Sequence, residues 1–233
     1  NKGFDLTINS TGTNNESGED EVWRFGLRVE SQGKVELGAD SAITINSDLA
    51  ECYTNGVWLD GQTDSDTYVV AVTGKGLTVN VNKDNANQQM NYASGVTMQD
   101  GSKMDLQGDL KLHVEAANEI DGIRIRDWSY SGAANTLQAQ NLEIYAKTSD
   151  GRIKGINSEG AHDKLTIAGS TNIKLEGQGN VAGILIQGSD ADSSFGKTVL
   201  DVTSTTDSIL DEWDSAHYAV SYTHLTLPTS DLV

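Results

Sequence analysis

The 233-residue chain is short of the residue types on which several familiar classes of site depend. It holds one cysteine, Cys52, which excludes an internal disulfide framework and a Cys-x-x-Cys metal site. Lys and Arg number 16 against 34 Asp and Glu, a net charge of −18, so the chain has no basic stripe with which to bind nucleic acid. No segment approaches the roughly 18 consecutive apolar residues of a membrane-spanning helix, and we expect no membrane insertion of this segment.

Proline is almost absent as well. The only proline is Pro228, whereas about ten would be usual in a chain of this length. Proline removes a backbone N–H, so its scarcity is typical of a chain in which every turn hydrogen-bonds to a neighbouring turn.

A short phrase recurs along the chain: a small residue, an apolar residue, any residue, and usually a second apolar residue. Its copies are about 32 residues apart on average, within the range typical of solenoid proteins. The phrase begins at Gly26, Gly56, Gly95, Gly122, Gly155 and Gly183, with a partial copy at 219–221.

Two further segments of alternating apolar and polar residues follow each copy of the phrase in a fixed order. Alternation with period two indicates strands with one buried face. The first set lies at 35–37, 70–72, 104–106, 137–139, 165–167 and 199–202. The second set lies at 43–45, 77–81, 110–114, 142–146 and 173–175, with a weaker segment near Ile209, and 4–8 resembles the last strand of an earlier turn.

Strands this short pair best with the equivalent strand of the next repeat, parallel and in register. We therefore predict an all-β fold over residues 1–220: a single-stranded, right-handed parallel β-helix with three short strands per turn and about six to seven turns. The alternative is an antiparallel sandwich or barrel, which also has short strands at regular spacing. We favour the β-helix because no Asn-Gly or Asp-Gly joins two of these strands as a two-residue hairpin loop.

Residues 221–233 break the pattern abruptly and contain the only proline. This segment resembles the translated adapter sequence that ends many metagenomic gene fragments, and the alternative is a genuine cap or the start of another turn. We expect a non-native tail, a natural protein that continues past Val220, and a β-helical fragment truncated at both ends.

With the repeat in view, the chain resembles the passenger regions of autotransporter-type bacterial surface adhesins. The likeness rests on the Gly-Ile-x-Ile phrases, on Leu-Thr-Ile-Ala-Gly at 165–169 and Leu-Thr-Val-Asn-Val at 77–81, on acidity, and on the scarcity of Cys and Pro. The resemblance implies a pectin-lyase-like fold and a non-enzymatic adhesin or rigid stalk of a virulence-associated kind. It also implies secretion across the outer membrane through a C-terminal translocator barrel and extracellular display at the bacterial cell surface. The expected partner is a host or neighbouring-cell surface protein or glycan, and no cofactor is implied.

Some β-helices are instead polysaccharide-active enzymes of the pectinase or lyase kind, which place carboxylates on an outward sheet face. We expect the outward positions of the first strand set to be Arg28, Trp58, Thr97, Arg124, Asn157 and Leu185. For the second they are Glu36, Ala71, Asp105, Gln138 and Thr166. Neither row puts two acids on adjacent turns, as the two-carboxylate mechanism requires, so we expect no catalytic residues here. Residues 152–154 resemble the Arg-Ile-Lys of polygalacturonases, but the partner Asp pairs and Gly-His-Gly are absent.

Other catalytic and metal sites have weaker support. The four histidines are isolated, and Cys52 is most simply a small hydrophobic residue. Acids at alternate positions could bind calcium, at Asp64 and Asp66 or at Asp190 and Asp192, but no Gly-Gly-x-Gly-x-Asp repeat accompanies them and we expect no metal.

Aromatic side chains are the best candidates for ligand binding, because an outward ring can stack on a sugar or anchor a protein partner. Trp58 falls at an outward strand position, and Trp128 and Tyr130 follow a later copy of the phrase. The alternative for 128–130 is that these rings close an apolar corner. We predict Trp58, Trp128 and Tyr130 as ligand-binding residues.

Overall fold

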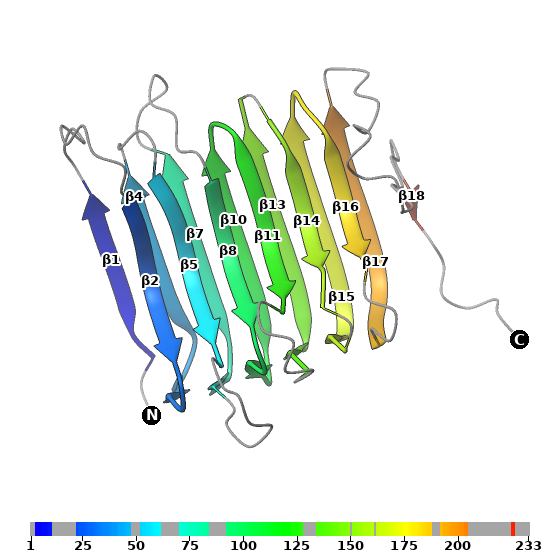
Figure 1. The fold of residues 1–233 in the computed structure, drawn as a ribbon. Helices are drawn as coiled ribbons and strands as arrows, with labels where there is room; N and C mark the ends of the chain where they lie inside the picture. The colour runs from blue at the N-terminus through cyan, green and yellow to red at the C-terminus, as the bar shows by residue number, and fades with distance from the viewer. Residues whose placement is uncertain are drawn as a thin grey trace, which may run out of the picture.

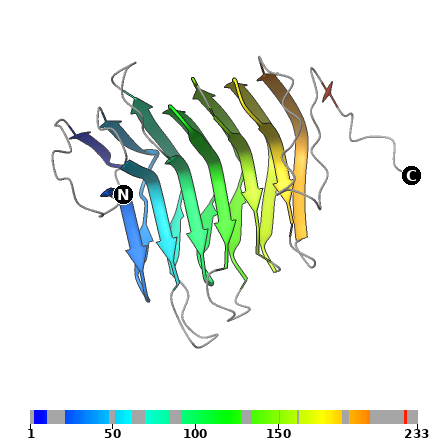
Figure 2. The same ribbon diagram turned by 45° about the horizontal axis from the view of Figure 1, so that its top comes forward.

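The computed structural model describes residues 3–10, 22–47, 52–61, 70–83, 92–127, 134–149, 151–160, 162–187, 192–204 and 225–226. These residues form β-strands and the turns between them, with no helix among them. Figure 1 shows two facing layers of strands whose directions are opposite, with short strands along the lower edge. When the molecule is turned, the strands of each layer are seen to lie side by side along one axis (Figure 2).

The front layer of Figure 1 is a six-stranded parallel sheet, called sheet B here. Every strand contains one copy of the recurring phrase. In spatial order the strands are β2 (Val22–Glu30), β5 (Cys52–Asp60), β8 (Tyr92–Gln99), β11 (Glu119–Arg126), β14 (Ile153–Ser158) and β16 (Val181–Ile186).

The remaining strands form sheet A, which contains two parallel stacks. The stack behind sheet B contains β1 (Asp5–Ser10), β4 (Ser41–Ser47), β7 (Leu77–Lys83), β10 (Asp109–Ala116) and β13 (Asn141–Thr148). The short stack contains β3 (Lys34–Glu36), β6 (Ala71–Gly74), β9 (Lys103–Leu106) and β12 (Thr136–Ala139). The two stacks are joined because β15 (Lys164–Gly177) and β17 (Asp192–Ser204) continue from one to the other, with a register shift between Ile167 and Ser170.

Each strand pairs with its equivalent about 30 residues further along the chain, in parallel, as the repeat predicted. The all-β fold with parallel strands is therefore confirmed, and the antiparallel sandwich is wrong for β1 to β17. The antiparallel pairing that the structure describes joins β17 to β18 (Leu225–Thr226), within the segment expected to be a non-native tail. One segment was assigned to the wrong set: residues 199–202 pair with 172–175 in the second set, and Asp192–Phe195 pairs with the first.

The core lies between the layers and runs their whole length. The residue after each phrase glycine faces inward, and Val57, Val96, Ile123 and Ile156 have no exposed surface. They pack in one cluster with the inward residues of sheet A, such as Ile43 and Ile144.

The phrase glycines lie in one column across sheet B, and close approach explains them. A Cβ at Gly122 would lie 2.5 Å from the carbonyl oxygen of Gly155 and 2.8 Å from Cγ2 of Ile144 on sheet A. Gly56, Gly95 and Gly155 face equivalent clashes with the next glycine of the column. Each strand thus presents two consecutive positions, the glycine and the residue after it, to the core, which breaks the alternation and brings the two sheets together.

A candidate binding face on sheet B

The glycine column determines which side chains share the outward face of sheet B. Because the glycine and the next residue both face the core, the residue before each glycine faces outward, as does the second residue after it. The outward face therefore carries two rows that flank the glycines: Phe25, Asn55, Ser94, Asp121, Lys154 and Ala182, and then Arg28, Trp58, Thr97, Arg124, Asn157 and Leu185.

Five aromatic rings gather at the β2 end of this face. Trp23 stacks on Tyr53 with ring centroids 4.7 Å apart, and Tyr53 lies 6.0 Å from Tyr92 on the next strand. Trp58 meets Trp23 and Phe25 edge to face, at 5.4 and 5.5 Å. We call these five residues the aromatic cluster.

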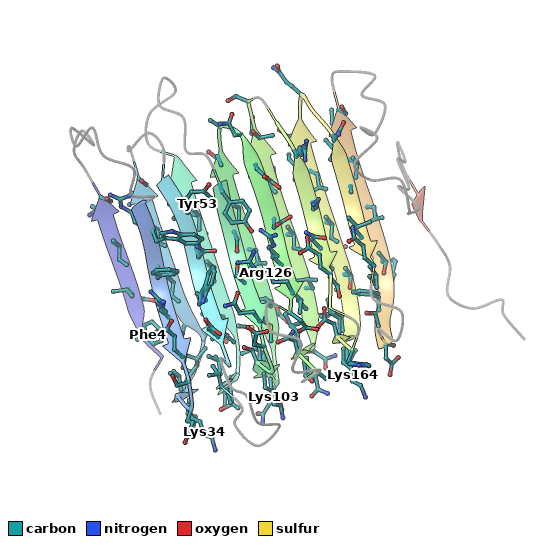
Figure 3. All side chains as sticks on the ribbon, viewed as in Figure 1. Phe4, Lys34, Tyr53, Lys103, Arg126 and Lys164 are labelled. Carbon is teal, nitrogen blue, oxygen red and sulfur yellow. The ribbon has the colours of Figure 1, made fainter. Side chains whose placement is uncertain are left out.

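Guanidinium groups border the aromatic cluster. Arg28 lies 4.6 Å from the ring centroid of Phe25, Arg124 lies 5.7 Å from that of Tyr92, and Arg126 lies 5.7 Å from that of Trp58. Figure 3 shows the labelled Tyr53 and Arg126 on the same face, from different strands. Each contact has the geometry of a cation–π interaction, which strengthens when water is excluded.

A buried polar network continues from the rings toward β14. The Tyr92 hydroxyl donates to Oδ2 of Asp121 at 3.0 Å. Thr97 donates to Oδ1 of Asn55 at 3.0 Å and lies 2.7 Å from the Ser94 hydroxyl. All these side chains are at least nine-tenths buried although they lie on the outward side of the sheet.

Asp121 is the most perturbed carboxyl group of the network. Burial raises its pKa from 3.8 to about 6, against the opposing influence of the positive charges on Lys154 and Arg124. Arg124 Nε lies 3.7 Å from Asp121 Oδ2, and Arg124 Nη2 lies 3.5 Å from Glu159 Oε2, so one guanidinium bridges two carboxylates. Burial lowers the pKa of Arg124, but its interactions with Tyr92, Glu159 and Asp121 raise it overall, so this residue stays charged.

Four buried polar atoms on this face have neither a hydrogen-bond partner nor an ion-pair contact within the part of the chain that the structure describes, whereas Arg124 Nε has only its ion pair with Asp121. The four atoms are Asn55 Nδ2, Trp58 Nε1, Asp121 Oδ1 and Asn157 Oδ1. A buried polar atom without a partner costs about 1–3 kcal/mol, and such atoms are rare in folded proteins. Their concentration on one face is the strongest sign of a ligand site in the described structure.

A second buried polar cluster, at the corner between sheet B and the short stack, is satisfied and structural. Asn135 accepts hydrogen bonds from the backbone N–H groups of Gly101 and Ser102 and donates to Asp163 at 3.0 Å. Asp163 in turn accepts from the Ser158 hydroxyl and from the backbone N–H of Gly160. These bonds tie three consecutive repeats together.

The outward row containing Trp58 has the register expected from the sequence, but Trp58 is only 7% exposed and does not protrude. In the short stack the expected Ala71 is wrong: Thr73 aligns with Glu36 and Asp105, because Ala71 pairs with Lys34. Ala71 belongs to the row that contains Lys34, Lys103 and Lys164, which lie along the lower edge of the molecule in Figure 3.

Several predicted site residues lie outside the described part of the chain, namely Trp128, Tyr130, Asp64, Asp66 and Asp190. Among the described residues, no three His, Cys, Asp or Glu side chains are grouped so as to hold a metal ion.

Sequence reasoning missed Asp121, Asn55 and Tyr92, because strict alternation puts the residue before each glycine on the core side. The signal was present in the polar residues at that position, Asn55, Ser94 and Asp121, where an inward row would be apolar. Aromatic residues also recur two places further upstream on β2 and β5, at Trp23 and Tyr53.

No protein-family model, no curated protein and no solved structure matches this chain. No helix in the described residues is long and apolar enough to cross a membrane.

Proposed function

We propose that this chain is part of a secreted, surface-displayed bacterial protein of the autotransporter type, serving as an adhesin or its rigid stalk. Its strands form a single-stranded, right-handed parallel β-helix of about six to seven turns, about 30 Å long at the spacing of stacked strands. The expected partner is a host or neighbouring-cell surface protein or glycan, bound through the outward face of sheet B.

The four buried polar atoms beside the aromatic cluster that have no partner among the described residues carry this proposal. Parallel ladders from β1 to β17 support the role of a rigid spacer, because each repeat hydrogen-bonds to the next. The cluster of Trp and Tyr rings supports binding at this face, since such rings dominate the energetics of recognition sites. Acidity keeps a long exposed rod soluble.

Binding of the purified chain to immobilised extracellular-matrix proteins and to a glycan array tests the recognition role. We expect at least one saturable interaction, which Trp58→Ala weakens about 30-fold because the indole is buried at the centre of the cluster. Tyr145→Ala on sheet A is the matched control and leaves binding unchanged. Binding that survives Trp58→Ala at full strength overturns the assignment to sheet B, and no binding to either panel overturns the adhesin role.

The genomic sequence that flanks this segment tests surface display. A reading frame that continues into a C-terminal translocator barrel supports it. A complete frame without one, and without any other export or anchoring segment, contradicts it.

A second function, polysaccharide cleavage, is favoured by one observation. Asp121 has a pKa raised to about 6, suited to a general acid near neutral pH, and shares Arg124 with a second carboxylate, Glu159. A depolymerisation screen with the purified chain separates the two functions. Turnover that Asp121→Asn abolishes would establish the enzyme, whereas binding without turnover supports the adhesin.

A further inference from the structure

We infer that the polar part of the sheet B face is a subsite for an uncharged saccharide of two or three units, held by Asn55, Trp58, Asp121 and Asn157. This inference rests on the proposed binding role of the face and gives its ligand a chemical class.

The buried atoms without partners in the described part of this face are of two kinds, donors and acceptors. Asn55 Nδ2 and Trp58 Nε1 are donors and both lie on β5. Asp121 Oδ1 on β11 and Asn157 Oδ1 on β14 are acceptors. A ligand that satisfies all four must accept hydrogen bonds at one end and donate them at the other.

Few ligand groups meet that requirement. A phosphate, sulfate or carboxylate accepts but does not donate, and an ammonium group donates but does not accept. A hydroxyl group does both from one atom and rotates to suit its neighbours. A molecule with hydroxyl groups along its whole length therefore fits this row of donors and acceptors.

The spacing of the strands sets the length of the ligand. Two strand spacings separate β5 from β11 and three separate β5 from β14, which corresponds to about 10 and 15 Å at roughly 4.8 Å per strand. A single sugar ring is too short to reach from Trp58 to Asn157. Two or three linked rings that lie across the strands, along the long axis of the molecule, span the distance.

Local charge also favours an uncharged ligand. The Arg124 guanidinium is already engaged by Asp121 and Glu159, and the Arg28 guanidinium by Glu30. An anionic sugar would have to compete with these carboxylates in a chain of net charge −18. The faces of sugar rings are lined with C–H groups, which pack well against aromatic rings such as Trp58 and Tyr92.

Access requires several side-chain movements, because Asn55, Asp121 and Asn157 are at most 1% exposed. Trp58 is 7% exposed and Arg126 lies over its ring. Arg126 is the last residue of β11 and is partly exposed, and rotamer changes of such side chains take place within nanoseconds. In this arrangement the ligand displaces the guanidinium and takes its place against the indole.

The test uses the whole purified chain, labelled with ¹⁵N, and a panel of uncharged oligosaccharides of two to four units built from glucose, xylose, mannose or N-acetylglucosamine. The Trp58 indole N–H gives a cross-peak that is assigned by its loss in Trp58→Phe, a variant that keeps an aromatic ring. We expect one oligosaccharide series to shift this cross-peak saturably. Trp58→Phe and Asn157→Leu should each weaken its binding about fivefold, the value of one hydrogen bond. The control variant, Tyr145→Phe on sheet A, keeps full affinity.

Several results would overturn the inference. One is that no oligosaccharide moves the indole cross-peak, and another is that a sugar binds equally well to Trp58→Phe. Preference for a charged oligosaccharide or for an extended peptide also contradicts it. If a matrix protein binds and is lost in Trp58→Ala while no sugar binds, the saccharide inference fails and the proposed adhesin survives. If nothing binds at all, both fail.

Discussion

The outward faces of the two sheets are built from the same repeats but differ in the burial and the hydrogen bonding of their polar side chains. On the outward face of sheet A the charged side chains around Tyr145 are exposed or partly exposed and paired. Lys174 and Lys147 lie 2.9 and 3.4 Å from the carboxylate of Glu176, and the Tyr145 hydroxyl donates to the same group. On sheet B, Asp121 and Asn157 are almost fully buried, and each keeps one oxygen without a partner among the described residues.

The amide side chains repeat this contrast. Asn46 donates to Asn9 at 2.8 Å and accepts from Asn82 at 2.9 Å, so a ladder of amides follows the stacked strands of sheet A. On sheet B, Asn55 accepts from Thr97 but its Nδ2 donates to no described group. Identical residues thus stabilise one face by pairing and leave the other with unmet hydrogen-bonding capacity. Unsatisfied groups of this kind depart from the pattern that stability alone favours, and they are the basis of the binding role proposed above.

The glycine column gives the largest test of this comparison, because only sheet B depends on it. Gly122→Ala puts a Cβ 2.5 Å from a backbone oxygen and 2.8 Å from Ile144, and the ladder cannot move locally to relieve both clashes. We expect the free energy of unfolding to fall by roughly 4 kcal/mol, measured by urea denaturation.

Gly183→Ala is the matched control in the same column. Its Cβ would meet the Leu200 side chain at 3.1 Å and no backbone atom within 4 Å among its three nearest neighbours, so the neighbour can yield. We expect a loss of about 1 kcal/mol or less. Equal losses at the two positions would show that loss of glycine itself, and not close approach, is responsible.

The aromatic cluster gives the next largest effect. Trp58→Ala removes a ring that is 7% exposed and contacts Trp23, Phe25 and Arg126, so we expect a loss of about 3 kcal/mol in thermal or urea unfolding. Tyr145→Ala removes an aromatic ring from the more exposed face of sheet A and should lower the free energy of unfolding by about 1 kcal/mol. If the free energy of unfolding falls equally in the two variants, the aromatic rings of sheet B are packed no more tightly than Tyr145 on sheet A.

Much of the fold could be predicted because alternation and the phrase interval are local signals. Segments such as 110–114 and 142–146 alternate strictly, and their pairing follows once the repeat is aligned. The last repeat was misassigned because its first strand, Asp192–Phe195, reads Asp-Ser-Ser-Phe and shows no clear alternation.

The site could be predicted only in part, because it depends on one break in the alternation. Trp58 directly follows the inward residue Val57, and strict alternation correctly places it on the outward face. Asp121 lies one residue before its glycine, where the same alternation gives the wrong face. The sequence alone does not reveal that the glycine faces inward, since that follows from the approach of Ile144 on a distant strand.

Titration of Asp121 makes the contrast between the faces visible in solution. Its pKa is about 6 in the folded chain and near 3.8 when unfolded, so between these values the folded state holds a proton that the unfolded state releases. This contribution to stability is complete below pH 4 and is lost as the pH rises through 6. We expect Asp121→Asn, compared with the parent chain in urea denaturation, to become relatively more stable by about 2 kcal/mol between pH 4 and pH 7.

Glu176→Gln on sheet A is the control and should show the opposite sign. The hydrogen bond from Lys174, the largest influence, lowers the pKa of Glu176. The ionised Glu176 therefore contributes to folding stability at neutral pH, and this contribution is lost as the pH falls from the ordinary glutamate pKa through the lowered one. Since the group is exposed, the change stays below about 1 kcal/mol. Two differences of the same sign would contradict the account of desolvation on sheet B.

The smallest expected change in the free energy of unfolding comes from replacing single asparagines, and its sign should differ between the two sheets. Asn46→Ala breaks two hydrogen bonds of the sheet A ladder and should lower the free energy of unfolding by about 1 kcal/mol. Asn157→Leu removes an oxygen that has no described partner, at the cost of one hydrogen bond to Glu159, and replaces it with an apolar group of similar size. We expect its stability to be unchanged or raised by up to about 1 kcal/mol in the same denaturation experiment, because a buried unpaired acceptor is eliminated. If Asn157→Leu lowered the free energy of unfolding as much as Asn46→Ala, the buried Asn157 oxygen would already have a hydrogen-bond partner in the free protein. The amides of sheet B would then be as fully hydrogen-bonded as those of sheet A.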